Sequence, residues 1–285
     1  MPRNVHWILW TGTVGFDTPI PERVRAANAE GFTRISISPT DVKRVQDAGG
    51  NARDIGKLAR NHGLELVMDP VVNWHPYSDP GPFKSAKFGL DEMLRMCEET
   101  CCSGMTAVGM MDSLIPTTAL PGLFADLCDR SASIGVDVHL EFIPMTVIRD
   151  LAMAWDIVRE AGRPNGGLLF DTWHFFRGNP DLKLLRTIPG ERIFAVQIDD
   201  ADEAVRGGLW EDTLHRKLPG DGQFDLRGAI RVLADIEGLN WVGPEVMSPY
   251  LAAMPAIDAA RLAGSRVRAL VDEVQRSIAS PAPSD

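Results

Sequence analysis

The strongest constraint on the fold of this chain is a regular alternation of short, β-rich apolar runs with longer stretches of helical spacing. The β-rich runs cover residues 5–10, 34–38, 64–68, 105–110, 136–142, 167–171, 193–199 and 240–246. The helical stretches cover residues 21–29, 52–61, 86–102, 117–134, 147–161, 181–187, 226–236 and 257–278. Such alternation predicts a parallel sheet whose neighbouring strands are joined by crossover helices.

Eight strand–helix units in 285 residues fit a closed (β/α)8 barrel, the TIM barrel, which typically takes about 250 residues. An open, doubly wound α/β sheet is the alternative, and it is disfavoured because no GxGxxG motif follows the first strand. No internal stretch has the composition of a linker, so we predict one α/β domain over residues 1–276. The tail, residues 277–285 (SIASPAPSD), is expected to be disordered.

Charge and hydropathy argue against two classes of partner. The chain has 39 acidic and 29 basic residues, a net charge of −10, which disfavours nucleic acids and membrane surfaces because both are polyanionic. No stretch approaches the ~18–20 continuous apolar residues of a membrane-spanning helix. The first residues lack the cleavage site of a signal peptide. The four cysteines form no CxxC pair, so we predict buried, reduced thiols and a cytoplasmic location.

Polar side chains stand where four consecutive predicted strands end. Glu141, Asp171 and Glu245 lie at the ends of the fifth, sixth and eighth strands, and Gln197 lies near the end of the seventh. Adjacent strand ends of a barrel converge on one side of its mouth, where unpaired carboxylates repel one another strongly. A hard divalent cation relieves that repulsion, and oxygen ligands suit Mg²⁺ or Mn²⁺ better than Zn²⁺. The sequence therefore predicts a metal site, although each carboxylate alone could instead cap a helix or pair with an arginine.

Two long loops leave the same end of the predicted barrel. Residues 73–87 follow the third strand and residues 201–224 follow the seventh. Because the active sites of such barrels are built at the carboxyl ends of the strands, we expect His75 to line a substrate pocket. Trp10 and Trp173 are candidates for an aromatic wall that contacts the substrate, although aromatic side chains more often belong to the core.

Five short segments, in this order and spacing, resemble one known family. They are HLEF (139–142), FDTWH (170–174), VQIDD (196–200), HRKLPGDG (215–222) and GPEV (243–246). Over residues 5–271 the chain resembles the sugar phosphate isomerase/epimerase family, the xylose isomerase-like TIM barrels. The resemblance implies a single (β/α)8 barrel and an enzyme.

The resemblance also implies one bound divalent metal ion, often Mn²⁺, at the ends of strands five to eight. Its ligands would be Glu141, Asp171 and Glu245, together with Gln197, which stands where the family usually has histidine. At this position the chain is similar to some dehydroshikimate dehydratases. An amide oxygen makes the site harder than an imidazole does, which favours Mn²⁺ or Mg²⁺ and leaves Co²⁺ and Zn²⁺ as alternatives.

Substrate contacts and a reaction class follow from the same resemblance. His174 matches the histidine of the family's D-x-x-H motif, and Arg216 matches an arginine that reaches substrate oxygens. The resemblance implies an isomerase or epimerase of a sugar or related small-molecule hydroxy-ketone, with a metal-stabilised enediolate. Glu141 and Glu245 would be the acid/base pair, and His174 a third catalytic residue. The sequence leaves open whether the chain forms a homo-oligomer.

Other functions stay open at this point. The same enolate could expel a β-hydroxyl, which would make the chain a dehydratase or β-eliminating lyase of a cyclic or sugar-like hydroxy-ketone. The sequence does not place the acid that such a leaving group needs, and a barrel without catalysis is a further alternative. DNA-repair endonucleases share this barrel, but six histidines and a net charge of −10 argue against a site that needs many histidines and a basic face.

Overall fold

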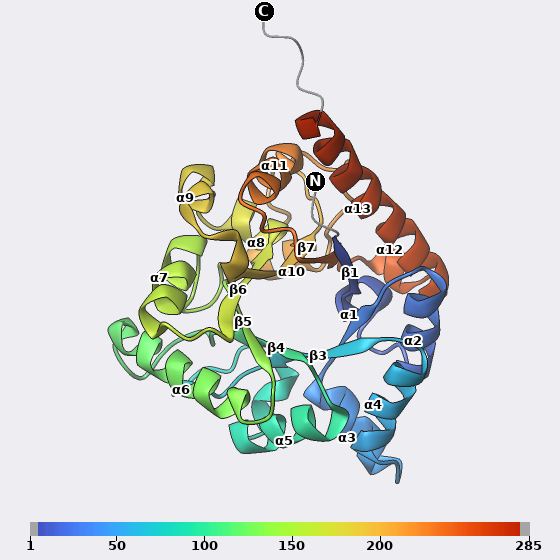
Figure 1. Cartoon of the computed structure of the whole chain (residues 1–285), viewed down its shortest axis with the longest axis vertical. Coiled ribbons are helices and arrows are strands. Elements are labelled where there is room, and N and C mark those ends of the chain that lie inside the picture. Colours follow the sequence, from blue (N-terminus) through green and yellow to red (C-terminus); the bar gives the residue numbers. More distant parts are fainter. Residues whose placement is uncertain (1–4, 280–285) are drawn as a thin grey trace, which may run out of the picture.

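The computed structural model describes residues 5–279, which contain a closed barrel of eight parallel strands. The strands are β1 (His6–Leu9), β2 (Arg34–Ile37), β3 (Glu65–Val71), β4 (Gly104–Val108), β5 (Asp137–Glu141), β6 (Gly166–Asp171), β7 (Ile193–Ile198) and β8 (Trp241–Pro244). Each strand pairs with the next along the chain, and β8 closes the barrel by pairing with β1. The predicted TIM barrel is confirmed, and Figure 1 shows the helices arranged around the outside of the strands.

All eight predicted helices are present in the outer ring. They are α2 (Ile20–Ala29), α4 (Ala52–Asn61), α5 (Leu90–Thr100), α6 (Leu120–Ala132), α7 (Leu151–Ala161), α9 (Leu182–Thr187), α11 (Leu226–Asp235) and α13 (Ala256–Ala279). Because α13 continues to Ala279, residues 277–279 of the predicted disordered tail are helical instead. The rest of that tail, residues 280–285, lies outside the described residues.

Additional short helices surround the mouth of the barrel or connect its elements. They are α1 (Thr11–Val14), α3 (Pro39–Asp47), α8 (Thr172–Arg177), α10 (Leu209–Thr213), α12 (Pro249–Ala252) and the 3₁₀ helices η1 (Lys84–Lys87), η2 (Thr117–Ala119) and η3 (Gly190–Arg192). At the start of α3, the Asp41 N–H donates to the Ser38 hydroxyl while the Ser38 N–H donates to the Asp41 carboxylate. This reciprocal cap explains why a helix follows β2 directly.

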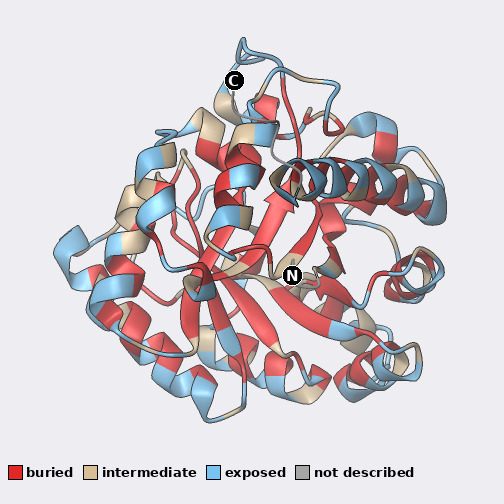
Figure 2. Cartoon of the chain, turned by 45° about the horizontal axis from the view of Figure 1, so that its top comes forward, coloured by how far each residue is buried: buried red, intermediate tan, exposed pale blue. Residues whose placement is uncertain are grey.

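Alternate residues of the strands enter two different apolar environments. One set packs against the helices in the main core and includes Leu9, Ile35, Ile37, Leu66, Met68, Leu140, Leu168, Phe170 and Val196. The intervening residues point into the barrel, where a second cluster contains Ile8, Trp10, Val67, Leu169 and Ala195. Figure 2 shows that the strands are buried along most of their length. Asp69, Glu141, Asp171 and Gln197 continue the inward series, so the strand period delivers them to the mouth of the barrel.

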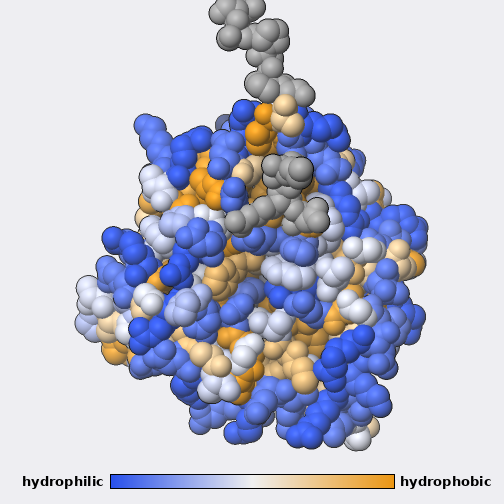
Figure 3. All heavy atoms as spheres, viewed as in Figure 1, coloured by the Kyte–Doolittle hydropathy of each residue, from blue (hydrophilic) through white to orange (hydrophobic). Residues whose placement is uncertain are grey.

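Polar side chains cover much of the face of the molecule that Figure 3 shows. Hydrophilic side chains predominate around the periphery of the face in Figure 3. None of the helices within residues 5–279 combines the length and apolar character that a bilayer-spanning segment needs. All four cysteines are free thiols, and three are buried as predicted. Cys101 is exposed instead, because the chain turns into the left-handed region at this residue (φ 56°) as α5 ends.

His139 belongs to the inward-facing series, two residues before Glu141, and is a core histidine. It is 2% exposed, and its ring packs edge to face against Phe194 with the centroids 5.7 Å apart. Burial lowers the pKa of His139 to about 3, and the Arg34 guanidinium adds to the shift. The imidazole is therefore neutral at pH 7 in the folded protein.

Replacing His139 by leucine should remove a pH-dependent part of the stability. A histidine has a pKa of about 6.5 in the unfolded chain but about 3 here, so the unfolded state takes up the proton first as the pH falls. The contribution of the neutral His139 ring to the free energy of unfolding is complete above about pH 6.5. Below that pH it falls by about 1.4 kcal/mol per pH unit. Between pH 7 and pH 5, the free energy of unfolding in urea should drop by about 2 kcal/mol more in the wild type than in His139→Leu.

His62→Gln is the control for this measurement, because His62 lies at the partly exposed end of α4. That variant should keep the wild-type dependence on pH. Equal losses of stability in the wild type and in His139→Leu would contradict the assignment of a neutral buried ring.

Candidate active site

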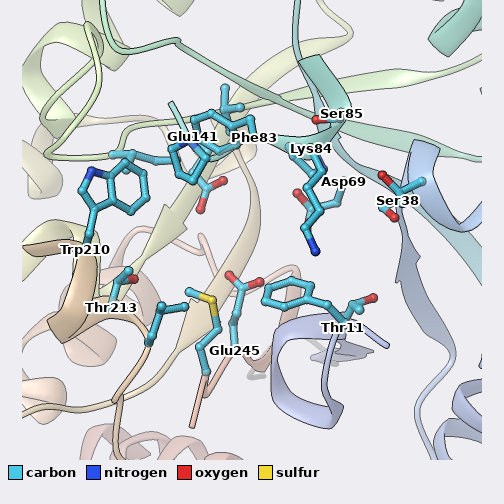
Figure 4. Close-up of a pocket in the computed structure, with 18 of the residues that line it drawn as sticks. Thr11, Ser38, Asp69, Phe83, Lys84, Ser85, Glu141, Trp210, Thr213 and Glu245 are labelled. Carbon is cyan, nitrogen blue, oxygen red and sulfur yellow. The ribbon is translucent and has the colours of Figure 1, made fainter. Parts of the chain in front are cut away.

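A cavity of about 620 Å³ opens at the carboxyl ends of the strands, within the range of ~300–1,000 Å³ that is usual for small-molecule sites. Its inner part is acidic, with Asp69 from β3, Glu141 from β5 and Glu245 just after β8 (Figure 4). Its outer wall is largely apolar. The two long loops contribute Phe83 and Trp210 to that wall, and the two rings meet edge to face with their centroids 6.3 Å apart.

Four neighbouring strands bring the predicted metal ligands to one side of the mouth. Glu141 and Asp171 are the last residues of β5 and β6. Gln197 lies opposite Asp171 in the β6–β7 register, and Glu245 directly follows the last residue of β8. The closed barrel therefore makes these four strand ends neighbours, as the sequence predicts.

Asp171 caps the short helix α8, which directs the His174 side chain toward Glu141. The His174 N–H donates to Asp171 Oδ1 over 2.8 Å, which caps α8. The His174 ring then places Nε2 3.3 Å from Glu141 Oε1. One ligand atom from each of Glu141, Asp171 and His174 lies within 4.8 Å of the other two, and all three residues are buried. This compact group includes His174, which the resemblance assigns to the substrate, and it does not include Glu245.

Gln197 supplies an independent sign that this region is built for a ligand. Its side chain is fully buried, and neither its amide oxygen nor its amide nitrogen has a hydrogen-bond partner among the described residues. An unsatisfied buried polar group costs about 1–3 kcal/mol, so such groups are rare without a function. The oxygen and nitrogen donors of Glu141, Asp171, His174 and Gln197 fit a divalent cation, because the cation would bind the Gln197 oxygen and offset the charge of the carboxylates.

Arg216 neutralises part of the buried negative charge. Its side chain is inaccessible and donates to Asp171 Oδ2 over 2.7 Å, to the Asp199 carboxylate, and to the Glu245 carbonyl oxygen over 3.2 Å. Burial alone would lower the pKa of Arg216, but Asp171 and Asp199 outweigh it and raise the pKa. Burial and the Asp171 charge raise the pKa of Asp199, against the effect of Arg216. Arg216 also lines the cavity, and its contact with a substrate stays a prediction.

The loop that carries Arg216 is organised by Asp200, the last residue of the VQIDD segment. The Asp200 carboxylate accepts backbone N–H groups at 2.9–3.1 Å from Ala201, Gly220, Gly222 and Phe224. Gly222 is required here, because a Cβ atom at this residue would lie 2.2 Å from Asp200 Oδ1. The HRKLPGDG segment is therefore wrapped around this carboxylate, which fixes the approach of Arg216 to Asp171.

One carboxylate of the cavity, Asp69, is absent from the site that the sequence predicts. Burial raises the pKa of Asp69 well above its usual range, and the neighbouring charge of Glu141 raises it further. Burial and then Asp69 likewise raise the pKa of Glu245. The two-residue period of the strands indicates this position, because Asp69 follows the inward-facing Val67 by two residues. The predicted third strand ended at Met68, whereas β3 continues to Val71.

Three residues predicted to contact the substrate lie away from the cavity wall. Trp10 is packed inside the barrel. The Trp173 ring N–H donates to Asp212 over 2.9 Å, and the buried His75 accepts the Met110 N–H at Nε2 over 3.1 Å. Their contact with a substrate stays a prediction. The aromatic wall that lines the cavity consists of Phe16, Phe83 and Trp210, all of which come from loops or short helices.

The family of this chain follows from its similarity to known proteins. The sequence model described as xylose isomerase-like TIM barrel matches residues 24–269. This chain belongs to the xylose isomerase-like TIM barrel family. The family that the five segments resemble is thereby confirmed, and with it the fold.

The chain is similar in sequence to two kinds of enzyme. The chain is 29% identical over 255 residues to 3-dehydroshikimate dehydratase of Pseudomonas aeruginosa, covering 85% of this chain but only 38% of that protein. It is 29% identical over 253 residues to inosose isomerase of Bacillus velezensis, covering 85% of this chain and 89% of that protein. The crystal structure of IOLI protein with a binding zinc atom has a TM-score of 0.82 at 19% identity, over 94% of this chain and 99% of that chain. That last likeness shows the fold.

Gln197 allows a direct test of the metal site. Gln197→Leu removes the amide oxygen, so its affinity for Mn²⁺ in equilibrium dialysis should fall by at least about tenfold. Gln197→His supplies an imidazole nitrogen in place of the amide oxygen, and it should bind Mn²⁺ near stoichiometrically. Gln223→Leu, at an exposed amide, is the control and should behave as the wild type does. Undiminished Mn²⁺ binding by Gln197→Leu would remove this residue from the ligand set.

Proposed function

We propose that this chain is a divalent-metal-dependent isomerase or epimerase that acts on a cyclic hydroxy-ketone through an enediolate. The observation that carries the proposal is the grouping of Glu141, Asp171 and His174 beside the unpartnered Gln197 amide, at a cavity of small-molecule size. Two relatives support it, because inosose isomerase is named for a cyclic hydroxy-ketone and IOLI protein holds zinc.

The chemistry begins at the carbon next to the substrate carbonyl. A divalent cation held by these donors would polarise that carbonyl and offset the negative charge that develops on its oxygen. Glu245 takes the α-proton onto its carboxylate, and the electron pair of the C–H bond becomes the C=C bond of the enediolate. Glu141 lies across the cavity from Glu245 (Figure 4), so it can return a proton from the opposite face. The Arg216 guanidinium adds a fixed positive charge beside Glu245.

Removing the proposed base should stop proton exchange. The wild type, loaded with Mn²⁺, should exchange the α-proton of a cyclic hydroxy-ketone such as inosose for deuterium in D₂O, followed by NMR. Glu245→Gln should exchange at least about 100-fold more slowly, because general-base catalysis typically contributes 10²–10⁴. Asp17→Asn changes an exposed carboxylate at the cavity mouth and should exchange at the wild-type rate. Rapid exchange by Glu245→Gln would assign the base to another residue.

A dehydratase is the second candidate, and Asp69 is the observation that favours it. In this reaction the enolate oxygen re-forms the C=O bond and the electron pair of the enolate C=C bond becomes a new Cα=Cβ bond. The Cβ–O bond breaks at the same time, and a proton from an acid turns the departing hydroxyl into water. Asp69 lines the cavity opposite the β5–β7 side, and burial favours its protonated form. Asp69 would therefore supply the acid that a dehydratase needs. The dehydratase relative is consistent with this alternative.

Asp69→Asn separates the two candidates. For a dehydratase, the variant should lose water formation by at least about 100-fold because it lacks the acid, while α-proton exchange continues within a few-fold of the wild type. The products are distinguished by mass spectrometry, since dehydration removes one water and isomerisation leaves the mass unchanged. An isomerase would give a product of unchanged mass in the wild type and in Asp69→Asn.

A further inference from the structure

The cavity is larger than a simple cyclic hydroxy-ketone requires. At about 30 Å³ for each water-sized group, its volume of about 620 Å³ has room for roughly twenty such groups, whereas a polyhydroxylated six-membered ring ketone has about twelve non-hydrogen atoms. The volume left beside a bound hydroxy-ketone is therefore large enough for a second six-membered ring.

The short helix α10 lines the outer part of the cavity with one face. Trp210 and Leu214 are four positions apart, so they lie on the same side of the helix, and both line the cavity together with Thr213. Phe83, from the loop after β3, packs edge to face against Trp210 with an angle of 79° between the ring planes. The two rings form a corner that suits a third aromatic ring, because aromatic rings prefer edge-to-face and offset contacts to a parallel sandwich.

The exposure of apolar side chains at this cavity is an independent observation. Trp210 is 38% exposed, Leu214 is 51% exposed and Phe16 is 55% exposed, and all three line the cavity. Within residues 5–279 only seven large hydrophobic side chains are exposed, so nearly half of them lie at this one cavity. Apolar side chains that gather at the mouth of a cavity indicate a surface that a ligand covers.

Polar and apolar groups occupy different parts of the cavity. Glu141, Asp171 and His174 are grouped at the strand ends, where they suit a cation and the oxygens around it. The segments that follow β5 and β8 add Met145 and Met247 to the apolar wall. A hydroxyl group held against that wall loses its hydrogen bonds to water without gaining others, which is unfavourable. A molecule that satisfies both parts is a hydroxy-ketone at one end and apolar at the other.

We infer that the corner between Phe83 and Trp210 binds an aryl group of the substrate, so that the enzyme selects cyclic hydroxy-ketones that carry an aromatic substituent. This inference rests on the proposed function and narrows its substrate class. The hydroxy-ketone reaches the strand ends, and the aryl ring packs against Phe83, Trp210 and Leu214. An unsubstituted cyclic polyol ketone leaves these apolar side chains in water, and this difference in buried apolar area is the basis of the selection.

The inference is tested by equilibrium binding, which does not depend on turnover. The probes are methyl β-D-glucoside and phenyl β-D-glucoside, two cyclic polyols that differ only in the apolar group, each titrated calorimetrically into the Mn²⁺-loaded protein. The wild type should bind the phenyl compound at least about tenfold more tightly, because its ring buries apolar surface and packs against aromatic side chains. Trp210→Ala should reduce this preference at least about fivefold, whereas Trp210→Phe should keep most of it.

Two further variants make the test specific. Tyr250→Ala removes an exposed aromatic side chain that does not line the cavity, so it should keep the wild-type preference. Phe83→Ala removes the other side of the corner and should weaken binding of the phenyl compound about threefold or more, with little change for the methyl compound. Thermal midpoints show that the variants fold, and Trp210→Ala should keep the wild-type midpoint because this side chain is exposed.

The inference is overturned if the wild type shows no preference for the phenyl compound, which includes binding neither probe, or if Trp210→Ala keeps the preference. It is also overturned if the wild type sediments as a dimer and Trp210→Ala as a monomer. In that case a second copy of the chain, and not a substrate, would cover the apolar side chains at the cavity mouth.

These outcomes are separate from a failure of the proposed function. Deuterium exchange with an unsubstituted cyclic hydroxy-ketone but no preference for the phenyl compound would leave the function standing and remove the aryl site. A preference that depends on Trp210, without exchange on any hydroxy-ketone, would support the aryl site and remove the proposed reaction.

Discussion

The mouth of this barrel depends on how buried negative charge is compensated. Asp171, Asp199 and Glu245 surround the Arg216 guanidinium, which pairs directly with the first two carboxylates and lies 4.0 Å from Glu245 Oε2. Two carboxylates that approach each other in a low-dielectric environment repel strongly, and removing one partner from such a cluster leaves an uncompensated charge. One guanidinium cannot compensate all five acidic side chains when Glu141 and Asp69 are included, and burial raises the pKa of Asp69, Asp199 and Glu245. The excess of acidic groups is the physical argument for the divalent cation that we propose at this site.

The barrel makes this arrangement possible because its rigid parts hold the charges in place. Parallel strands with a period of two send every second side chain inward, and closure places the ends of β5 to β8 side by side. The apolar layers beneath them, from Ile8 and Val67 to Leu169, leave no room for the charged side chains to move deeper. Asp200 fixes the loop from above through four backbone N–H groups. The carboxylates are thereby held close together although each would be more stable apart.

The sequence predicts most of the fold because the two-residue period of the strands and the 3.6-residue period of the helices are both strong in it. The two-residue alternation of the strands locates Glu141, Asp171, Gln197 and Glu245 without any knowledge of the loops. Asp69 was not predicted, because the expected third strand stops at Met68 and so leaves this residue outside the sheet, whereas β3 continues to Val71. Trp10 and Trp173 show a different limit: their burial depends on contacts with distant residues, such as the bond from Trp173 to Asp212, and local spacing carries no information about such contacts.

For the same reason, the residues of the outer cavity wall could not be predicted from the spacing of apolar and polar residues in the sequence. Lys84 and Trp210 lie 126 positions apart in the chain, yet both line one cavity because the loops after β3 and β7 meet above the barrel. Strand period determines where the reaction takes place, whereas loop contacts determine which molecule reaches it. Proteins that share this fold can therefore differ in the reaction they are named for, as inosose isomerase and 3-dehydroshikimate dehydratase do. In this chain the strand ends deliver the acidic groups Asp69 and Glu141, whereas the loops deliver the aromatic side chains Phe83 and Trp210.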